Sequence, residues 1–189
     1  MEKLILTDVD GVLLDWETAF HDWMKTKGFV ADESQYSYDM HIRFDMQKHK
    51  IKELIVEFNE SAWICCLKPL RDAVDGISRL AEAGYRFGAI TSLSVDPYAA
   101  KLREQNLITV FGDVWNFIQC LDTGADKDQA LVPYRDSGLI WVEDKPENAQ
   151  LGADLGLKTF MIRHRYNANF SYCGVKSVDN WAQIVNAIV

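Results

Sequence analysis

The sequence has no uninterrupted apolar run of about 18 residues, so no segment of it predicts a membrane span. Its first residues, MEKLIL, also lack the basic start, the long apolar stretch and the cleavage site of a secretory signal peptide. We therefore expect a cytoplasmic protein with no membrane partner.

Cysteine is scarce, and the four cysteines do not have the spacing of a metal site. They are Cys65, Cys66, Cys120 and Cys173, and no two of them are separated by two residues. This pattern argues against a disulfide framework and against a thiolate zinc site. We expect reduced thiols that act as small apolar side chains.

Positive charge is in deficit. The chain has 20 Lys and Arg residues against 28 Asp and Glu residues, which gives a net charge of -8 and a pI of about 5.0. Such a balance disfavours a stable nucleic-acid partner and binding to anionic lipid. A small anionic substrate stays compatible with it, because a local cation can reverse the field inside a pocket.

Strand-like and helix-like patterns alternate along much of the chain. Apolar, strand-like runs lie at 3–9, 87–90, 138–144 and 157–162, with a weaker strand and loop expected within 108–118. Helical spacing occurs at 15–27, 45–59, 69–83, 96–105, 146–155 and 178–188, and 30–45 is expected to be a loop. This alternation predicts an α/β protein with a three-layer, Rossmann-like core, in which helices cover both faces of a parallel sheet.

Residues 16–68 do not fit the alternation, because they contain helical patterns and an irregular stretch between the first two strands. We expect them to form a small helical insertion after the first strand. Residues 1–15 and 69–189 would then form one core, as the length of 189 residues suggests.

Polar groups follow three of the predicted strands. These groups are Asp8 and Asp10, Thr91 and Ser92, and Glu143 and Asp144. Ligands of open parallel sheets bind beyond the carboxyl ends of the strands, so we expect these side chains to lie together. Clustered carboxylates raise one another's pKa unless a cation lies between them, and Mg²⁺ suits a site that offers a few oxygen ligands.

Each of these signals has an alternative when taken alone. The stretch that begins at Asp8 could open a calcium loop, but apolar residues follow where that loop needs oxygen ligands. Asp144 could cap the helix that begins at Pro146, and Lys127 could be a solvated surface lysine. We expect surface or packing roles for His21, His41, His49 and His164, and surface positions or the mouth of the site for Arg163 and Arg165.

Four motifs in order resemble those of the haloacid dehalogenase-like phosphatase superfamily. The stretch Asp8-Val9-Asp10-Gly11-Val12 resembles the first motif, and Thr91 at the end of FGAIT resembles the second. Lys127 in GADKDQAL is a candidate for the third motif, and Asp144 in LIWVEDKPEN resembles the fourth. The resemblance covers roughly residues 3–162, and it implies a catalytic core with a small helical cap at 16–68.

The resemblance implies a catalytic role for each motif. Asp8 would be the nucleophile that forms an aspartyl-phosphate, and Asp10 would transfer protons to and from the leaving oxygen and water. Thr91, favoured over Ser92 by register, would bind a phosphoryl oxygen. Lys127 would neutralise phosphoryl charge and keep Asp8 ionised.

The resemblance also implies a Mg²⁺ site. The carboxylates of Asp8 and Asp144 and the backbone carbonyl of Asp10 would be its protein ligands. A second acid often follows the first in the fourth motif, but Asn148 stands at that position here. The sequence leaves open whether Glu143 or Asn148 supports the metal.

The implied activity is Mg²⁺-dependent hydrolysis of a small phosphomonoester. The flanking segments more loosely resemble 5'(3')-deoxyribonucleotidases, which favours a nucleoside monophosphate. Aromatic residues of the insertion could stack on a base; they are Trp16, Phe20, Tyr36, Tyr38, Phe44 and Trp63. Another phosphorylated metabolite, a nucleic-acid 3'-phosphate and a non-catalytic phospho-ligand remain alternatives.

Overall fold

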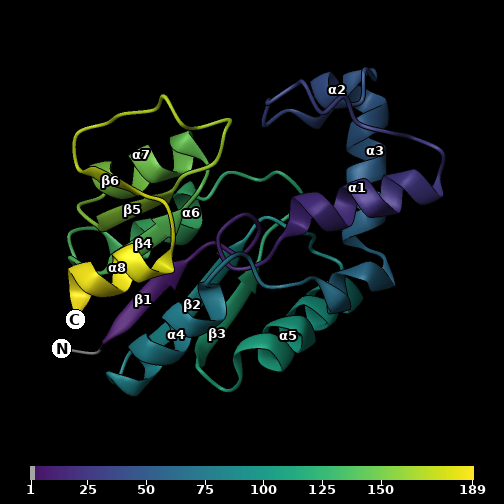
Figure 1. Cartoon of the computed structure of the whole chain (residues 1–189). Helices are drawn as coiled ribbons and strands as arrows, with labels where there is room; N and C mark the ends of the chain where they lie inside the picture. Colours follow the sequence, from purple (N-terminus) through teal and green to yellow (C-terminus); the bar gives the residue numbers. More distant parts are fainter. Residues whose placement is uncertain (1–2) are drawn as a thin grey trace.

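The computed structural model describes residues 3–189, which are built around a six-stranded sheet (Figure 1). The strands are β1 (Leu4–Thr7), β2 (Arg86–Thr91), β3 (Trp115–Cys120), β4 (Ile140–Glu143), β5 (Lys158–Ile162) and β6 (Val175–Val178). Their order is β3-β2-β1-β4-β5-β6, and every neighbouring pair is parallel. This doubly wound order confirms the predicted Rossmann-like α/β core.

Helices cover both faces of the sheet. One face carries α4 (Ala73–Glu82), α5 (Pro97–Phe111) and α8 (Trp181–Ile188), and the other carries α6 (Asp128–Leu131), the short 3-10 helix η2 (Val132–Tyr134) and α7 (Pro146–Asp154). Along β1, Ile5 joins the first of these cores, whereas Leu4 and Leu6 join the second. The strand β1 is therefore buried along its whole length, and its first three residues are apolar because both faces of the sheet are covered.

The segment between β1 and β2 is mostly helical, as its sequence predicts. It contains α1 (Trp16–Thr26), α2 (Met40–Arg43), α3 (Lys48–Asn59) and the 3-10 helix η1 (Ala62–Cys66). Figure 1 shows α1, α2 and α3 set to one side of the sheet. We call residues 16–68 the helical insertion.

The chain enters and leaves the helical insertion at adjacent points. The backbone N–H of Asp15 donates to the carbonyl of Lys68 over 2.9 Å, and the N–H of Leu70 donates to the carbonyl of Leu13 over 2.8 Å. Leu14 also forms an isolated β-bridge with Pro69. This pairing explains why α4 begins at Ala73 rather than at Pro69, where the sequence predicts a helix start.

Four other elements differ from the sequence prediction. The helix α5 continues to Phe111, six residues past its predicted end at 105, and β3 begins only at Trp115. Gly112, with a φ of 76°, ends this helix, whose last turns contain β-branched residues that tertiary packing keeps helical. The short helix α2 and the edge strand β6 were not predicted, because each has four residues and a weak pattern.

Within residues 3–189 no helix is long and apolar enough to cross a membrane. All four cysteines are free thiols.

Candidate active site

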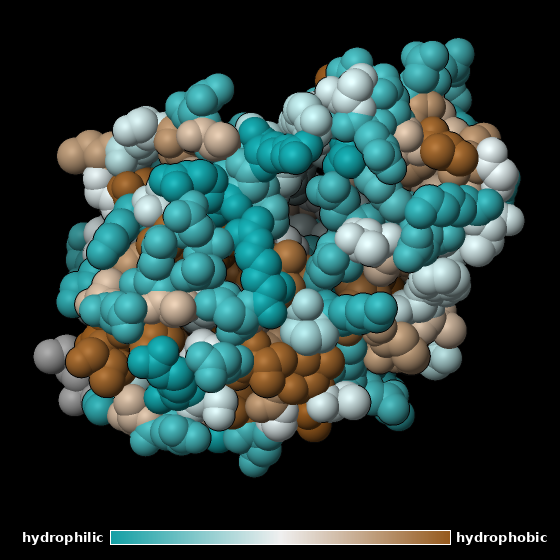
Figure 2. All heavy atoms as spheres, in the orientation of Figure 1, coloured by the Kyte–Doolittle hydropathy of each residue, from teal (hydrophilic) through white to brown (hydrophobic). Residues whose placement is uncertain are grey.

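Three neighbouring strands deliver polar side chains to one edge of the sheet. Asp8 follows β1, Thr91 ends β2, and Asp144 follows β4; all three side chains are buried. Because β1 lies between β2 and β4, these residues meet at one end of a cavity of about 560 Å³. The cavity lies between the core and the helical insertion, and Figure 2 shows a recess there bordered largely by hydrophilic residues.

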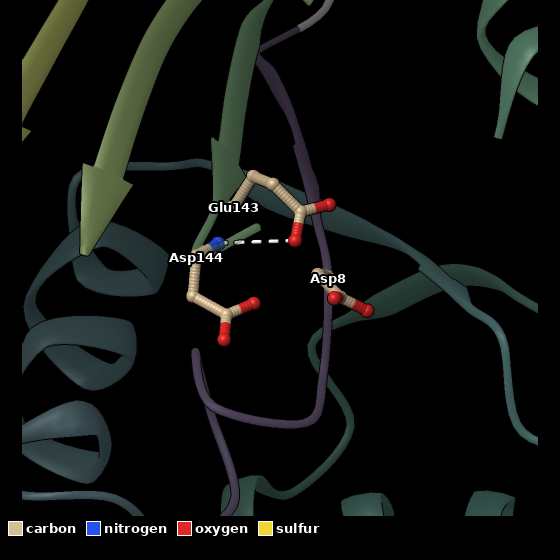
Figure 3. A group of neighbouring side chains, drawn as sticks. All are labelled: Asp8, Glu143 and Asp144. Carbon is tan, nitrogen blue, oxygen red and sulfur yellow. Dashed lines mark hydrogen bonds between the residues drawn. The ribbon is translucent and has the colours of Figure 1, made fainter. Parts of the chain in front are cut away.

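Three carboxylates cluster at the floor of this cavity, where Asp8 and Asp144 line it and Glu143 is fully buried. One oxygen atom each of Asp8, Glu143 and Asp144 lies within 4.8 Å of the others (Figure 3). Glu143 accepts backbone hydrogen bonds from Asp144, over 3.0 Å, and from Lys145, over 3.1 Å. These bonds hold the Glu143 carboxylate in place, and the carboxylates of Asp8 and Asp144 border the cavity.

Lys127 joins two of these acids. Its Nζ lies 2.7 Å from Asp8 Oδ2 and 2.9 Å from Glu143 Oε2. The side chain is buried and its ammonium lies over the ring of Trp141. The structure therefore places the predicted lysine against the predicted nucleophile, and Lys127 is not a surface lysine.

Burial and charge shift the pKa values of these groups in different directions. Burial raises the pKa of Asp8 well above its ordinary value, and the charge of Glu143 adds to this effect. Burial and the charges of Glu143 and Asp8 likewise raise the pKa of Asp144. Burial also opposes the ionisation of Glu143, but Lys127 and hydrogen bonds outweigh it and lower its pKa to about 2.

Burial alone would lower the pKa of Lys127, but the carboxylates of Asp8 and Glu143 outweigh burial and hold it above its ordinary value. The lysine is therefore a fixed positive charge. One ammonium cannot neutralise three carboxylates, and Asp8 and Asp144 stay costly to ionise. A divalent cation with oxygen ligands would relieve this cost, so the donor set fits Mg²⁺.

Gly11 allows Asp144 to approach the first motif. Its φ of 76° lies in the left-handed region, and a Cβ at this position would lie 2.3 Å from Asp144 Oδ2. Any side chain here would push the carboxylate out of the cluster. The glycine of the first motif is thus explained by close approach as well as by its backbone conformation.

The loop after β5 closes one side of the site, and sequence reasoning missed its role. Tyr166 Oη donates to Asp144 Oδ2, and Asn167 Nδ2 donates to the backbone carbonyl of Asp144 over 2.7 Å. The ring of His164 stacks on Tyr166, and its Nε2 lies 2.7 Å from the carbonyl of Gly11. These residues follow β5 at the same edge of the sheet as Asp8 and Asp144. Their position after a strand could therefore have indicated a role at the site from the sequence.

The two hydroxyl groups after β2 differ in their surroundings. Among residues 3–189, Thr91 Oγ1 has no hydrogen-bond partner although it is buried beside the cavity. Ser92 Oγ donates instead to the carbonyl of Ala125 over 2.8 Å. A buried hydroxyl without a partner is costly, so Thr91 is suited to binding a polar ligand atom.

Asp10 borders the cavity, but its carboxylate is also held by Arg103, a residue that the sequence did not single out. The guanidinium lies 2.7 Å from Asp10 Oδ1 and 2.9 Å from Oδ2. No pattern in α5 marks this arginine, because a charged residue in a helix is ordinarily exposed.

The helical insertion supplies the far wall of the cavity. Apolar side chains there include Met40, Ile51 and Ile55. Of the six aromatic residues that the sequence singled out, Trp16 and Tyr38 line this cavity. The others lie elsewhere: Phe20 and Phe44 are buried in the core, Tyr36 lines an adjacent cavity, and Trp63 is exposed.

No family model matches the sequence. Over 137 residues the chain is 27% identical to an uncharacterized 32.4 kDa protein of Enterobacteria phage T4, from the Gp30-rIII intergenic region. The match covers 68% of this chain and 48% of the phage protein, so the chain spans about half the length of this relative.

Solved structures are similar over nearly the whole chain. CbbY from Rhodobacter sphaeroides, in complex with phosphate, gives a TM-score of 0.63 at 16% identity, with 97% of this chain and 96% of that chain covered. The L-2-haloacid dehalogenase from Xanthobacter autotrophicus gives 0.66 at 9% identity, with 100% and 98% covered. D,D-heptose 1.7-bisphosphate phosphatase from B. bronchiseptica, complexed with magnesium and phosphate, gives 0.60 at 14%, also with 100% and 98% covered.

These similarities confirm the fold that the four motifs imply. The chain has the fold of the haloacid dehalogenase-like superfamily.

Proposed function

We propose that this protein, with its haloacid dehalogenase-like fold, is a phosphatase that hydrolyses a small phosphomonoester. The observation that carries the proposal is the pairing of Asp8 with the buried Lys127 over 2.7 Å, at the floor of an open cavity. A carboxylate held beside a fixed ammonium can attack phosphorus while the ammonium offsets the charge of the phosphoryl group. Binding alone would not require a second acid, Asp10, at the cavity edge.

The donor set of the floor fits a divalent cation. Asp8 and Asp144 would supply carboxylate oxygens, and the backbone carbonyl of Asp10 is the third ligand that we propose. Glu143 is committed to Lys127 and to backbone N–H groups, so we assign it to supporting this set. When bound, Mg²⁺ would neutralise charge on the phosphoryl oxygens and help to orient them.

The first chemical step transfers the phosphoryl group to the protein. An oxygen of Asp8 attacks phosphorus, and the bond from phosphorus to the ester oxygen breaks. Asp10 donates a proton to that oxygen, so the product leaves as a neutral alcohol. Thr91 would donate its free hydroxyl to a phosphoryl oxygen, because no residue of the described chain accepts from it.

The second step restores Asp8. Water attacks phosphorus, Asp10 takes a proton from the water, and the bond between phosphorus and the Asp8 oxygen breaks. The products are inorganic phosphate and the free carboxylate of Asp8. The presence of phosphate, and of magnesium, in structures that share this fold supports the same use of this chain's site.

The far wall of the cavity favours a substrate that carries a flat, partly apolar group. Trp16 and Tyr38 are aromatic, and Met40, Ile51 and Ile55 are apolar. A nucleobase could contact such a wall by stacking and apolar burial. We therefore propose a nucleoside monophosphate as the first substrate to test, and the helical insertion as the cap that selects it.

The test is turnover of a phosphate panel with and without Mg²⁺. The panel contains nucleoside monophosphates, sugar phosphates, a 3'-phosphorylated oligonucleotide and p-nitrophenyl phosphate. We expect Mg²⁺-dependent release of phosphate, fastest from a nucleoside monophosphate. No turnover of any substrate would refute the enzymatic proposal, and faster turnover of sugar phosphates would refute the nucleotide preference.

The variant Asp8→Asn tests the nucleophile. It should lower kcat by at least about 1,000-fold, because the covalent route is lost. The matched control is Asp126→Asn, which removes an exposed carboxylate directly before Lys127 in the sequence and should keep wild-type turnover. Near-wild-type activity of Asp8→Asn would contradict the covalent mechanism.

A further inference from the structure

The Asp10 carboxylate is held by an arginine that the mechanism above does not use. Arg103 Nη1 lies 2.7 Å from Asp10 Oδ1, and Arg103 Nη2 lies 2.9 Å from Oδ2. Two parallel contacts of this kind form a bidentate pair. A planar guanidinium in such a pair fixes both the position and the plane of the carboxylate.

The two partners of this pair differ in exposure. The Arg103 side chain is 0% exposed, whereas the Asp10 side chain is 24% exposed and borders the cavity. Arg103 lies within α5, where its neighbours Leu102 and Leu107 belong to the hydrophobic core. The arginine is therefore anchored by packing, and it presents one fixed edge to Asp10.

The pair leaves Asp10 able to make further contacts. A carboxylate has about four acceptor positions, and a bidentate guanidinium occupies two of them. The exposed part of Asp10 is on the cavity side, because Arg103 itself has no exposed surface. Arg103 therefore binds Asp10 on its buried side, and the remaining acceptor positions of Asp10 face the cavity.

We propose that Arg103 is a positioning residue that fixes the Asp10 carboxylate for proton exchange with the leaving oxygen. This inference rests on the proposed function, since Asp10 exchanges a proton only if a phosphate ester is cleaved. Without the guanidinium, the Asp10 side chain loses both hydrogen bonds and can rotate. A displacement of about 1 Å at a reacting group can cost about 100-fold in rate.

The test compares two substrates whose leaving groups differ in their need for a proton. The leaving group of an alkyl phosphate is a strongly basic alkoxide, which needs the proton from Asp10. The alkyl phosphate used is the one that the wild-type protein turns over fastest in the panel. The phenolate released from p-nitrophenyl phosphate is stable without it. In Arg103→Met, we expect kcat/KM to fall about 10- to 100-fold for the alkyl phosphate and less than about 3-fold for p-nitrophenyl phosphate.

Two further variants make the result specific. Arg103→Lys keeps the charge but not the bidentate contact, so it should show the same unequal loss, and it decides the question if Arg103→Met does not fold. Lys101→Met removes an exposed charge from the same helix and should keep wild-type kcat/KM for both substrates. Equal losses on the two substrates would show a general structural role and overturn the proposal, as would no loss on either.

Failure of the proposed function has a different signature. In that case the wild-type protein turns over neither phosphate in the presence of Mg²⁺, which overturns both proposals together. A wild-type protein that turns over both substrates, with equal losses in Arg103→Met and Arg103→Lys, overturns the positioning role alone.

Discussion

Three neighbouring residues determine the position of Asp144. Gly11 leaves room for its carboxylate, Tyr166 donates a hydrogen bond to Oδ2, and Asn167 donates one to its backbone carbonyl. Hydrogen bonds of this kind orient a metal-binding carboxylate before the metal arrives. The loop after β5 therefore contributes to the proposed cation site without supplying a ligand to it.

Removing the Tyr166 hydroxyl should weaken the binding of Mg²⁺. In Tyr166→Phe, the Asp144 carboxylate is less well oriented, and we expect the apparent affinity for Mg²⁺ to fall about 10- to 100-fold. Isothermal titration calorimetry with MgCl₂ measures this affinity. Tyr172→Phe is the control, because the Tyr172 hydroxyl bonds the exposed carboxylate of Asp154, away from the cavity. Equal affinities for Tyr166→Phe and the wild-type protein would contradict this role.

Three of the residues that the sequence placed at the site share one property. Asp8, Thr91 and Asp144 follow apolar strands, and the sheet-edge rule brings such positions together. Lys127 was found by its resemblance to a motif, since it precedes a helix and follows no strand end. Arg103 could not be found this way, because its partner Asp10 is 93 positions away and only the tertiary structure shows their contact.

At the scale of elements, the packing of α4 against α8 depends on a residue without a side chain. Gly76 on α4 faces Trp181 at the start of α8, and a Cβ on Gly76 would lie 2.4 Å from the Trp181 Cβ. Figure 1 shows the two helices side by side. The N–H groups of Trp181 and Ala182 also bond the Asp72 carboxylate, which joins the same two elements.

Gly76→Ala should therefore lower the free energy of unfolding, even though alanine is the better helix former. The added methyl group must push α8 outward, and overpacking of this kind costs about 1–3 kcal/mol. Urea denaturation followed by circular dichroism measures the difference. Ser78→Ala, on the exposed side of α4, is the control and should change stability by less than about 0.5 kcal/mol. A stability equal to or above wild type would show that α8 moves without cost.

The helix α1 contains a histidine that should respond to pH. Burial lowers the pKa of His21, and the neighbouring charge of Arg43 lowers it further. The unfolded chain therefore takes up a proton at a higher pH than the folded chain does. The free energy of unfolding should fall as the pH falls below the ordinary value of 6.5, and should be unaffected by this group above it.

Urea denaturation at pH 5 and pH 7 checks the effect of His21. The free energy of unfolding should be lower at pH 5 than at pH 7, and the difference should be small because the ring is only partly buried. In His21→Gln, the free energy of unfolding should fall less between pH 7 and pH 5 than it does in the wild-type protein. His49→Gln, which removes an exposed histidine from α3, should keep the wild-type pH dependence. Identical slopes for His21→Gln and the wild-type protein would show that His21 titrates alike in both states.

At the scale of the whole molecule, the net charge of -8 adds to the local repulsion among the buried carboxylates. A cation that binds only the folded site stabilises the protein by mass action, by about 2.7 kcal/mol at a concentration 100 times its Kd. Millimolar Mg²⁺ should therefore raise the melting temperature. Differential scanning calorimetry measures the shift, with NaCl of equal ionic strength as the control for screening.

The variant Asp144→Asn separates site binding from general screening. It should abolish the shift that Mg²⁺ causes and leave the smaller effect of NaCl unchanged. An Mg²⁺ shift of wild-type size in Asp144→Asn would place the cation elsewhere on this acidic chain.

The central strands of the sheet were predictable because they are buried on both faces. Runs such as LILT of β1 and IWVE of β4 are buried along their whole length, so they appear in the sequence as short, mainly apolar runs. The edge strand β6, VKSV, is partly exposed and has no such apolar run. The positions of α1, α2 and α3 over the cavity depend on contacts between distant residues, which periodicity does not encode.

The paired backbone at residues 13–15 and 68–70 has a consequence for how such a protein can diversify. The two ends of the helical insertion adjoin, so the core follows the same path whatever lies between them. An insertion with adjacent ends can be lengthened, shortened or exchanged with little effect on the host fold. The junction would let one contiguous segment of the cavity wall be replaced while the residues of the proposed catalytic site stay in place.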